Sequence, residues 1–175
     1  MECLYYLTKV KFCDGKKGVY IFMKIFKAAT ELMKDQLGYD VIISLATCSE
    51  NGVSVRNVDG YYKDGSVYVV TYGASQKMQD IHRRANVAIC KDLMCAQGIG
   101  ENLGNPKAES NRELREELKK VFVAFYDRHV NEDDPKTCIL KITLTSAVVF
   151  SKDTKYIIDY KNSKATTIPF VNDII

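Results

Sequence analysis

Tryptophan is absent from this 175-residue sequence, and proline and histidine are scarce, with three and two copies. The six cysteines form no C-x-x-C motif, and neither His82 nor His129 lies near a cysteine pair. Zinc sites need closely spaced Cys and His ligands, so we expect no metal site. Most of the cysteines lie in or beside apolar, strand-like runs: Cys48, Cys90, Cys95 and Cys138. Cysteine in such runs usually serves as a small buried hydrophobe, which favours a reducing, cytoplasmic setting.

Long apolar runs, a basic stripe and a glycine-rich phosphate loop are missing too. No stretch approaches the roughly 20 apolar residues of a membrane-spanning helix. Lys9, Lys11 and the segment 14–17 interrupt the N-terminus, which argues against a signal peptide. The net charge is only +3, with basic residues spread along the chain, unlike the pattern of a nucleic-acid binder. We therefore expect no membrane or nucleic-acid partner, and no nucleotide hydrolysis.

Length and composition indicate one globular domain. Hydrophobic residues make up 46% and charged residues 27%, close to the averages for globular proteins. A regular apolar pattern begins only at Met23. We treat residues 1–22 as an N-terminal extension, either a loosely attached segment or the product of an upstream start, and assign residues 23–175 to the domain.

The first half of the domain predicts a helix followed by an antiparallel meander. Apolar spacing predicts the helix over Met23–Gln36. The next segments have the apolar character and length of strands: Val41–Cys48, Val53–Tyr62 and Val67–Thr71. They are joined at Asn51-Gly52 and Asp64-Gly65, dipeptides that tolerate the positive φ of tight hairpin turns.

The second half predicts two more helices and further strands. Helical patterns cover Ser75–Arg84 and Glu109–Arg128, the latter expected to be the longest helix. Gly98 and Gly100 indicate a bulge or a close backbone approach within their strand. The strands expected here are Asn86–Lys91, Leu93–Leu103, Cys138–Phe150 and Tyr156–Tyr160. About six to seven short strands and three helices predict a mainly β fold without strand–helix alternation.

The segment from Val69 to Met78 is the most informative for function. A strand ends at Thr71, and Ser75 is a good N-cap for the next helix, whose N-terminus would attract an anion. Lys77 in the first turn opposes the helix dipole, which suits a bound phosphate, although an ordinary capped surface helix would explain it as well. Arg56, in the middle of a strand, offers a forked phosphate donor or a simple salt bridge.

Taken together, these segments resemble a known family. An apolar strand ending Leu45-Ala-Thr47 precedes Arg56-Asn-Val58, then Thr71-x-x-x-Ser75-x-Lys77, then Asn86-Val-Ala-Ile. This order is similar to that of the pyridoxamine 5′-phosphate oxidase-like, FMN-binding split-barrel superfamily, over about 23–160. The resemblance implies an antiparallel split β-barrel and a homodimer with FMN at the interface. It also implies cofactor-binding residues: Arg56, Asn57, Val58, Thr71, Ser75, Gln76 and Lys77.

The chain departs from this family at two places. Gln76 stands where the oxidases usually carry a second phosphate-binding arginine, which suggests weaker or altered flavin binding. No arginine or histidine follows His129, although the true oxidases use such residues for the vitamin phosphate. We expect a flavin-dependent oxidoreductase with another substrate, with a nicotinamide or other electron donor and no assigned catalytic side chain. Two alternatives stay open: a non-catalytic flavin-binding or sensing module, and a haem- or deazaflavin-binding relative.

Overall fold

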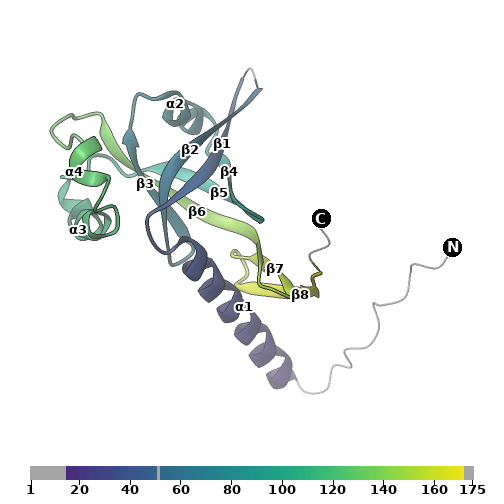
Figure 1. Ribbon diagram of the computed structural model, residues 1–175. Coiled ribbons are helices and arrows are strands. Elements are labelled where there is room, and N and C mark those ends of the chain that lie inside the picture. The colour runs from purple at the N-terminus through teal and green to yellow at the C-terminus, as the bar shows by residue number, and fades with distance from the viewer. Residues whose placement is uncertain (1–14, 51, 172–175) are drawn as a thin grey trace.

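The computed structural model of this chain describes residues 15–50 and 52–171. Within them the chain is mainly β, with one eight-stranded sheet, one long helix and several short ones (Figure 1). The strands are β1 Val41–Ser49, β2 Gly52–Lys63, β3 Ser66–Tyr72, β4 Asn86–Lys91, β5 Met94–Asn102, β6 Thr137–Phe150, β7 Thr154–Asp159 and β8 Lys164–Pro169. The helices are α1 Gly15–Leu37, α2 Gln76–Arg83, the 3-10 turn η1 Glu109–Asn111, α3 Arg112–Val121 and α4 Tyr126–His129.

The sheet closes into an antiparallel barrel, which confirms the predicted fold class. The strand order is β3-β2-β1-β4-β5-β6, and β6 pairs back with β3 to complete the ring. The hairpin β7–β8 continues from β6 and lies beside α1 (Figure 1). Closure removes the open edges that a flat sheet of these strands would expose.

Two hydrophobic cores lie on opposite sides of the barrel wall. The inner core fills the barrel and takes in Met33 and Leu37 of α1. The outer core lies between the wall and the α3–α4 layer, and contains Val70, Leu118, Phe122, Tyr126 and Ile139. Strands β3 and β6 are therefore covered on both faces, because each contributes side chains to both cores.

The predicted turn and bulge signals are confirmed where the structure describes them. Asp64 and Gly65 both have positive φ, at 48° and 77°, and join β2 to β3 in two residues. Asn51 lies outside the described residues. The β5–β6 register shifts between Gln97 and Gly98, and a Cβ on Gly98 would lie 2.7 Å from Ile142 Cγ2 and 2.8 Å from the Thr143 carbonyl oxygen. The close approach of β6 therefore requires glycine at position 98.

Replacing Gly98 by alanine should destabilise the barrel. The added methyl group would meet the Thr143 backbone, which cannot move away without disturbing β6, at a cost of about 1–3 kcal/mol. Urea unfolding followed by circular dichroism measures this loss. Gln97→Ala, at an exposed neighbouring position, should leave the midpoint nearly unchanged. Equal midpoints for the two variants would contradict the packing argument.

The helices differ most from the prediction. The expected helix Glu109–Arg128 is wrong as a single element, because the chain leaves helical geometry at Phe122, where φ is −91° and ψ is 40°. This break buries Phe122 completely and sets its ring edge-on to Phe125, with centroids 6.2 Å apart. The longest helix is α1, which begins at Gly15 and so includes part of the expected N-terminal extension; residues 1–14 lie outside the described residues. None of the helices in the described segments is long and apolar enough to cross a bilayer.

The cysteines also differ from the prediction. Of the four cysteines that the structure describes, only Cys138 is buried; Cys48 and Cys90 are half-buried, and Cys95 is exposed. Alternate residues of a strand face opposite sides of the barrel wall, and Cys90 and Cys95 fall on the outer side. An apolar run in the sequence does not reveal which side each residue takes.

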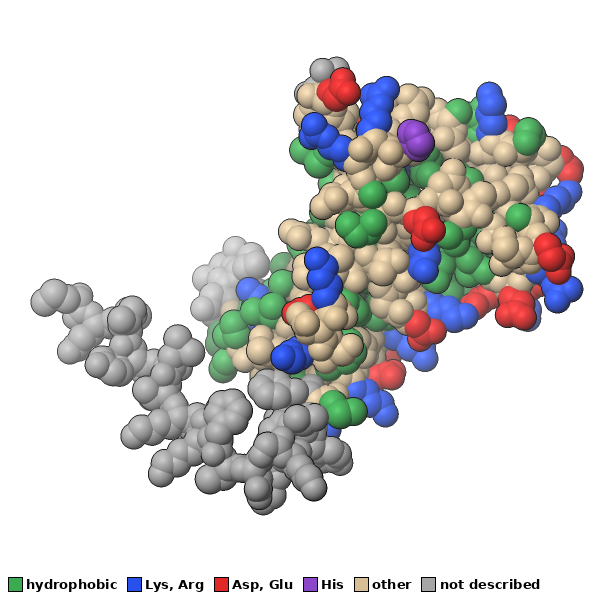
Figure 2. Space-filling view, turned by 180° about the vertical axis from the view of Figure 1, so that it is seen from behind, with side chains coloured by type: hydrophobic (Ala, Val, Ile, Leu, Met, Phe, Trp, Pro, Cys, Tyr) green, Lys and Arg blue, Asp and Glu red, His purple; other side chains and the backbone are tan. Residues whose placement is uncertain are grey.

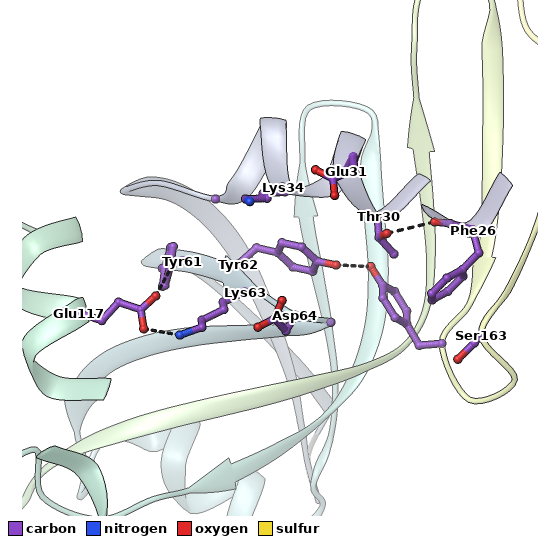
Figure 3. A pocket seen from close by; sticks show the side chains of 13 residues that line it. Phe26, Thr30, Glu31, Lys34, Tyr61, Tyr62, Lys63, Asp64, Glu117 and Ser163 are labelled. Carbon is purple, nitrogen blue, oxygen red and sulfur yellow. Dashed lines mark hydrogen bonds and ion pairs between the residues drawn. The ribbon is translucent and has the colours of Figure 1, made fainter. Parts of the chain in front are cut away.

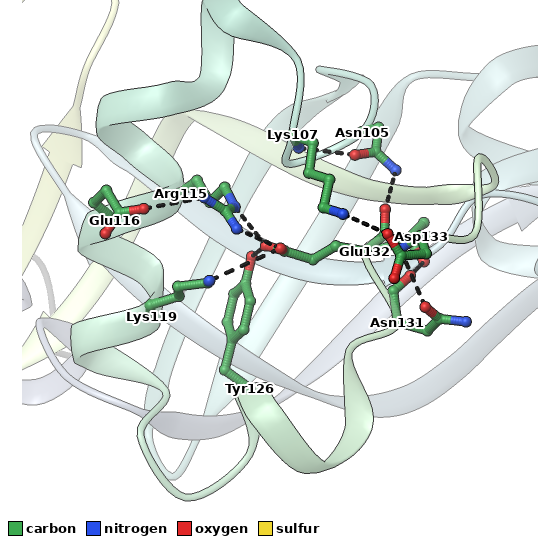
Figure 4. A network of polar contacts seen from close by, with 10 residues as sticks. Asn105, Lys107, Arg115, Glu116, Lys119, Tyr126, Asn131, Glu132 and Asp133 are labelled. Carbon is green, nitrogen blue, oxygen red and sulfur yellow. Dashed lines mark hydrogen bonds and ion pairs between the residues drawn. The ribbon is translucent and has the colours of Figure 1, made fainter.

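Polar contacts around Glu132 hold the loop after α4 against α3 (Figure 4). The Glu132 carboxylate accepts two hydrogen bonds from Arg115, at 2.7 and 2.6 Å, and one from the Tyr126 hydroxyl at 2.8 Å. Lys119 Nζ lies 3.8 Å away. The hydrogen bonds from Arg115, followed by the one from Tyr126, lower the pKa of Glu132 from 4.5 to about 2 despite its burial.

The lowered pKa of Glu132 predicts that the folded protein loses stability in acid. Because the folded-state pKa is below the unfolded value, the stabilisation is complete above about pH 4.5 and is lost as pH falls towards about 2. Glu132→Gln should lower the urea midpoint at pH 7 and flatten its decline between pH 4.5 and about 2, the window between the unfolded and folded pKa values of Glu132. Glu109→Gln, at an exposed pair with Arg112, is the matched control and should follow the wild-type curve. A Glu132→Gln curve parallel to wild type would contradict the assignment.

Candidate functional site

Arg56 lies where β1, β2 and α2 meet. It pairs with Leu45 across β1–β2 and faces the barrel interior, on the same side as Val58. Its Nη1 donates hydrogen bonds to Thr47 Oγ1 at 2.7 Å and to the Leu45 carbonyl oxygen at 3.2 Å. The guanidinium thus lies close to α2, which packs at one end of the barrel (Figure 1).

A buried carboxylate that the sequence analysis missed completes this arrangement. Asp80 of α2 is fully buried and accepts hydrogen bonds from Thr47 Oγ1 at 2.8 Å and Gln76 Nε2 at 2.7 Å. Arg56 Nη2 lies 3.9 Å from the Asp80 carboxylate. The hydrogen bonds from Gln76 and Thr47, helped by the Arg56 charge, lower the pKa of Asp80. The only sequence signal was the Gln76–Asp80 spacing of four residues, which puts both on one helix face.

Removing the Arg56 side chain should destabilise the barrel end. Arg56→Ala takes a favourable charge away from Asp80 and a donor away from Thr47, so the urea midpoint should fall. In Arg56→Ala/Asp80→Asn the carboxylate charge is gone as well, and the total loss should be smaller than the sum of the two single losses. Strictly additive losses would contradict the coupling.

Ser75 occupies the expected N-cap position but does not cap the helix. Its side chain makes no hydrogen bond to the first turn of α2. Among the described residues its Oγ is the one buried side-chain oxygen or nitrogen without a hydrogen-bond partner. Such an atom is costly to bury, since a hydroxyl gives up its hydrogen bonds to water. The first turn of α2 therefore carries a polar atom with unused bonding capacity.

Lys77 places a cation in the same turn. Burial and the nearby Arg56 charge lower its pKa, while Cys138 has a small opposite effect. No ion pair joins Lys77 to an acidic side chain within the described part of the chain. The first N–H groups of a helix also lack acceptors within it. Together these groups can hold an oxyanion: they offer a hydroxyl, backbone N–H groups and an ammonium.

The remaining predicted residues take different positions. Gln76 is bonded to Asp80 and so has an internal partner. Thr71 pairs with Cys138 at the end of β3, close to this cluster in the fold. Asn57 is exposed on the outer side of β2, where it accepts a hydrogen bond from Ser44 Oγ at 3.1 Å, and Val58 packs against the inner core. The structure therefore brings Arg56, Gln76 and Lys77 together beside Ser75, but turns the Asn57 and Val58 side chains elsewhere.

Two hollows of similar volume lie near α1 and near α2. A cavity of about 600 Å³ between α1 and the β2–β3 hairpin holds the Tyr62 and Tyr160 hydroxyls, 3.2 Å apart (Figure 3). Its charged groups are partly paired, because Glu117 binds both Tyr61 and Lys63. A second hollow of about 590 Å³ borders α2 and is lined by Gly73, Met78, Gln79, Ile81, His82, Arg83, Gly100 and Asn102. Acidic and basic side chains are interspersed over the face shown in Figure 2.

Comparisons with known proteins give structural matches only. No protein-family model and no curated protein sequence matches the chain. A candidate pyridoxamine 5′-phosphate oxidase from Listeria innocua matches with a TM-score of 0.52 at 14% identity, over 70% of this chain and 95% of its own. A FAD-binding protein from Mesorhizobium loti matches with a TM-score of 0.55 at 15% identity, over 68% and 91% of the two chains.

A haem-binding protein from Mycobacterium smegmatis matches with a TM-score of 0.54 at 11% identity, over 81% of this chain and 57% of its own. An F420 reductase is also among the matching structures. These structural matches establish the fold, and identities this low leave the ligand open. The closed barrel and these neighbours together show that the chain has the split-barrel fold of the pyridoxamine 5′-phosphate oxidase-like proteins.

Proposed function

We propose that this chain binds FMN and is a flavin-dependent oxidoreductase whose substrate is not a vitamin B6 phosphate. The observation that carries the proposal is the buried, unpartnered Ser75 Oγ next to Lys77 in the first turn of α2. A phosphate monoester is a dianion that accepts several hydrogen bonds, and helix N-termini attract such groups. Two structural neighbours, a FAD-binding protein and an F420 reductase, support the choice of cofactor class.

The residues fit the phosphate of FMN in a simple way. Ser75 Oγ would donate a hydrogen bond that it does not make among the described residues, and Lys77 would supply a positive charge from the same turn. Arg56 would add positive potential, although Asp80 offsets part of its charge. Gln76 is neutral and is bonded to Asp80. This site therefore has one cation fewer than the oxidases that carry arginine at this position. When bound, the flavin supplies hydride or single-electron transfer, and these residues bind and orient it.

Ser75→Ala separates binding from folding. The variant should bind FMN more weakly by about 1–3 kcal/mol, the scale of a hydrogen bond to a charged group. Its urea midpoint without FMN should be unchanged or higher, because the buried hydroxyl has no partner to lose. Fluorescence titration of FMN into the apoprotein measures the affinity. Unchanged affinity, or a loss of affinity matched by a loss of stability, would contradict the assignment of Ser75 to the phosphate site.

Lys77→Ala tests the charge. It should weaken FMN binding by a similar 1–3 kcal/mol, roughly the value of a charge-assisted hydrogen bond, and the loss should shrink in high salt. Lys161→Ala removes an exposed lysine after β7 and is the matched control. Equal affinities for the two variants would argue against a phosphate at α2.

A haem-binding function is the second candidate, favoured by one observation. His82 of α2 lines the hollow of about 590 Å³ that borders the helix, and imidazole is a common axial ligand of haem iron. The absorption spectrum of the purified protein distinguishes the two candidates. Flavin bands with FMN released on denaturation support the main proposal, and a Soret band that disappears in His82→Ala supports haem. Bleaching of the bound flavin by NAD(P)H separates an enzyme from a storage or sensing module.

The proposal includes a homodimer, as the resemblance to the split-barrel superfamily implies. Val53 and Val55 lie on the outer side of β2, the strand that carries Arg56, with 68% and 65% of their surface exposed. Neighbouring apolar side chains this exposed are typical of an interface. The cytoplasmic location expected from the cysteine pattern stays a prediction.

Val55→Glu should disrupt this dimer. A charge in the middle of an apolar interface is costly, so the variant should sediment as a monomer and lose FMN affinity as well. Val123→Glu, at a position 74% exposed near the turn between α3 and α4, is the matched control. Analytical ultracentrifugation gives the oligomeric state. A dimeric Val55→Glu variant with normal FMN binding would contradict the placement of the interface.

A further inference from the structure

Two cysteines face each other across the β4–β5 hairpin, away from the candidate phosphate site. Cys90 and Cys95 are direct cross-strand partners, and their sulfur atoms lie 3.3 Å apart. They stand one residue from the two-residue turn Asp92-Leu93, at the end of β4 opposite α2. Asp92 and Leu93 are exposed, and so is Cys95, which leaves the pair open to small reagents from the turn side.

The register suits a covalent bond between these sulfurs. Residues flanking a two-residue hairpin turn form a hydrogen-bonded pair, here Lys91 and Met94. Pairs alternate along an antiparallel ladder, so Cys90 and Cys95 form the non-hydrogen-bonded type, in which Cα atoms lie about 4.5 Å apart. Disulfides span Cα separations of about 4.4–6.8 Å, so a small rotation of the side chains is enough to join the sulfurs.

The surroundings of Cys90 and Cys95 differ from those of the other described cysteines. Cys138 is buried in the inner core, with 3% of its surface exposed, as expected of a small hydrophobe. Cys48 pairs with Val53 across β1–β2 and has no cysteine opposite it. Cys90 and Cys95 border a shallow apolar groove of about 440 Å³ on the outer side of the barrel. Burial therefore does not explain why two thiols meet at this surface position.

We propose that Cys90 and Cys95 form a reversible disulfide, a two-electron redox site whose oxidant is a small-molecule disulfide. The Cys95 thiolate attacks one sulfur of the oxidant RSSR, forming a mixed disulfide and releasing RS⁻, which takes up a proton. Cys90 then loses its proton and attacks Cys95 Sγ, forming the Cys90–Cys95 bond and releasing the second RSH. In sum, two protein thiols and RSSR give one protein disulfide and two RSH, and a dithiol reductant reverses the reaction.

The order of attack follows from exposure and hydrogen bonding. Cys95 is exposed, whereas Cys90 is half-buried and can donate its S–H to Cys95 Sγ or to the Asp92 carbonyl oxygen. The contact with Cys95, together with burial, raises the pKa of Cys90. The exposed Cys95 is therefore the attacking thiol, and Cys90, which is half-buried, is the resolving one.

The sequence provides a direct assay. Lys91 separates the two cysteines, so trypsin puts Cys90 in peptide 85–91 and Cys95 in peptide 92–107. The full-length chain is equilibrated in buffers of reduced and oxidised glutathione, quenched by alkylation, digested and measured by mass spectrometry. The two peptides should become linked as the oxidised fraction rises, and dithiothreitol should abolish the link. Peptides that stay separate, alkylated or singly glutathionylated at every ratio would overturn the proposal.

Single variants test the assigned roles. In Cys90→Ser the glutathione adduct should accumulate on Cys95, because the resolving thiol is missing. In Cys95→Ser adduct formation on Cys90 should be much slower, and both variants should lose the linked peptide. Cys48→Ser is the control and should form the linked peptide as the wild type does. Equal adduct formation in the first two variants would overturn the order of attack, and a link that depends on Cys48 would overturn the pairing.

Discussion

The Asp80 carboxylate is the interaction on which the candidate site depends. One oxygen binds the hydroxyl of Thr47 on β1, the other binds the amide of Gln76 in the first turn of α2, and the Arg56 guanidinium of β2 lies beside it. A buried carboxylate needs such partners, since its desolvation is otherwise costly. Because the partners come from two strands and a helix, the same contacts fix α2 across the barrel end. The position of Ser75 and Lys77 relative to Arg56 follows from this arrangement.

This arrangement gives Arg56 two roles with opposite demands. As a partner of Asp80 it is part of the folded barrel, and its charge is partly compensated before any ligand binds. As a cation near Lys77 it contributes positive potential to the first turn of α2. The unused bonding capacity therefore lies mainly with Ser75 and Lys77. The site resembles many binding sites in keeping a polar atom unsatisfied in the free protein, at some cost in stability.

Sequence signals predicted those features of the fold that depend on local backbone geometry. The Asp64-Gly65 turn follows from the positive φ that these residues tolerate, and the irregularity at Gly98 follows from the absence of a side chain. The helix over 109–128 failed for the opposite reason. Its apolar spacing continues without interruption through Phe122. The helix α3 ends there because the Phe122 ring is buried in the outer core against the barrel wall. Tertiary packing overrode the periodic pattern, as it often does.

The site was predictable in part for a similar reason. Arg56 and Lys77 stand out in the sequence as cations at unusual positions for a strand and for a helix N-terminus. Asp80 does not, since a single acidic residue in a short helix has the pattern of a solvated one. Likewise, the position of Cys95 on the outer side depends on the register of β5 with β6, which no apolar run reveals. Contacts between distant segments are the information that a single sequence lacks.

The two cores on either side of β3 and β6 have a consequence for local stability. The α3–α4 layer is held on the barrel by the outer core around Phe122 and by the contacts of Glu117 with Tyr61 and Lys63, while the barrel has an inner core of its own. Opening of this layer would expose Val70 and Ile139 on the wall but leave the inner packing intact. The separate outer core therefore allows the helical layer to open locally while the barrel and α2 stay folded.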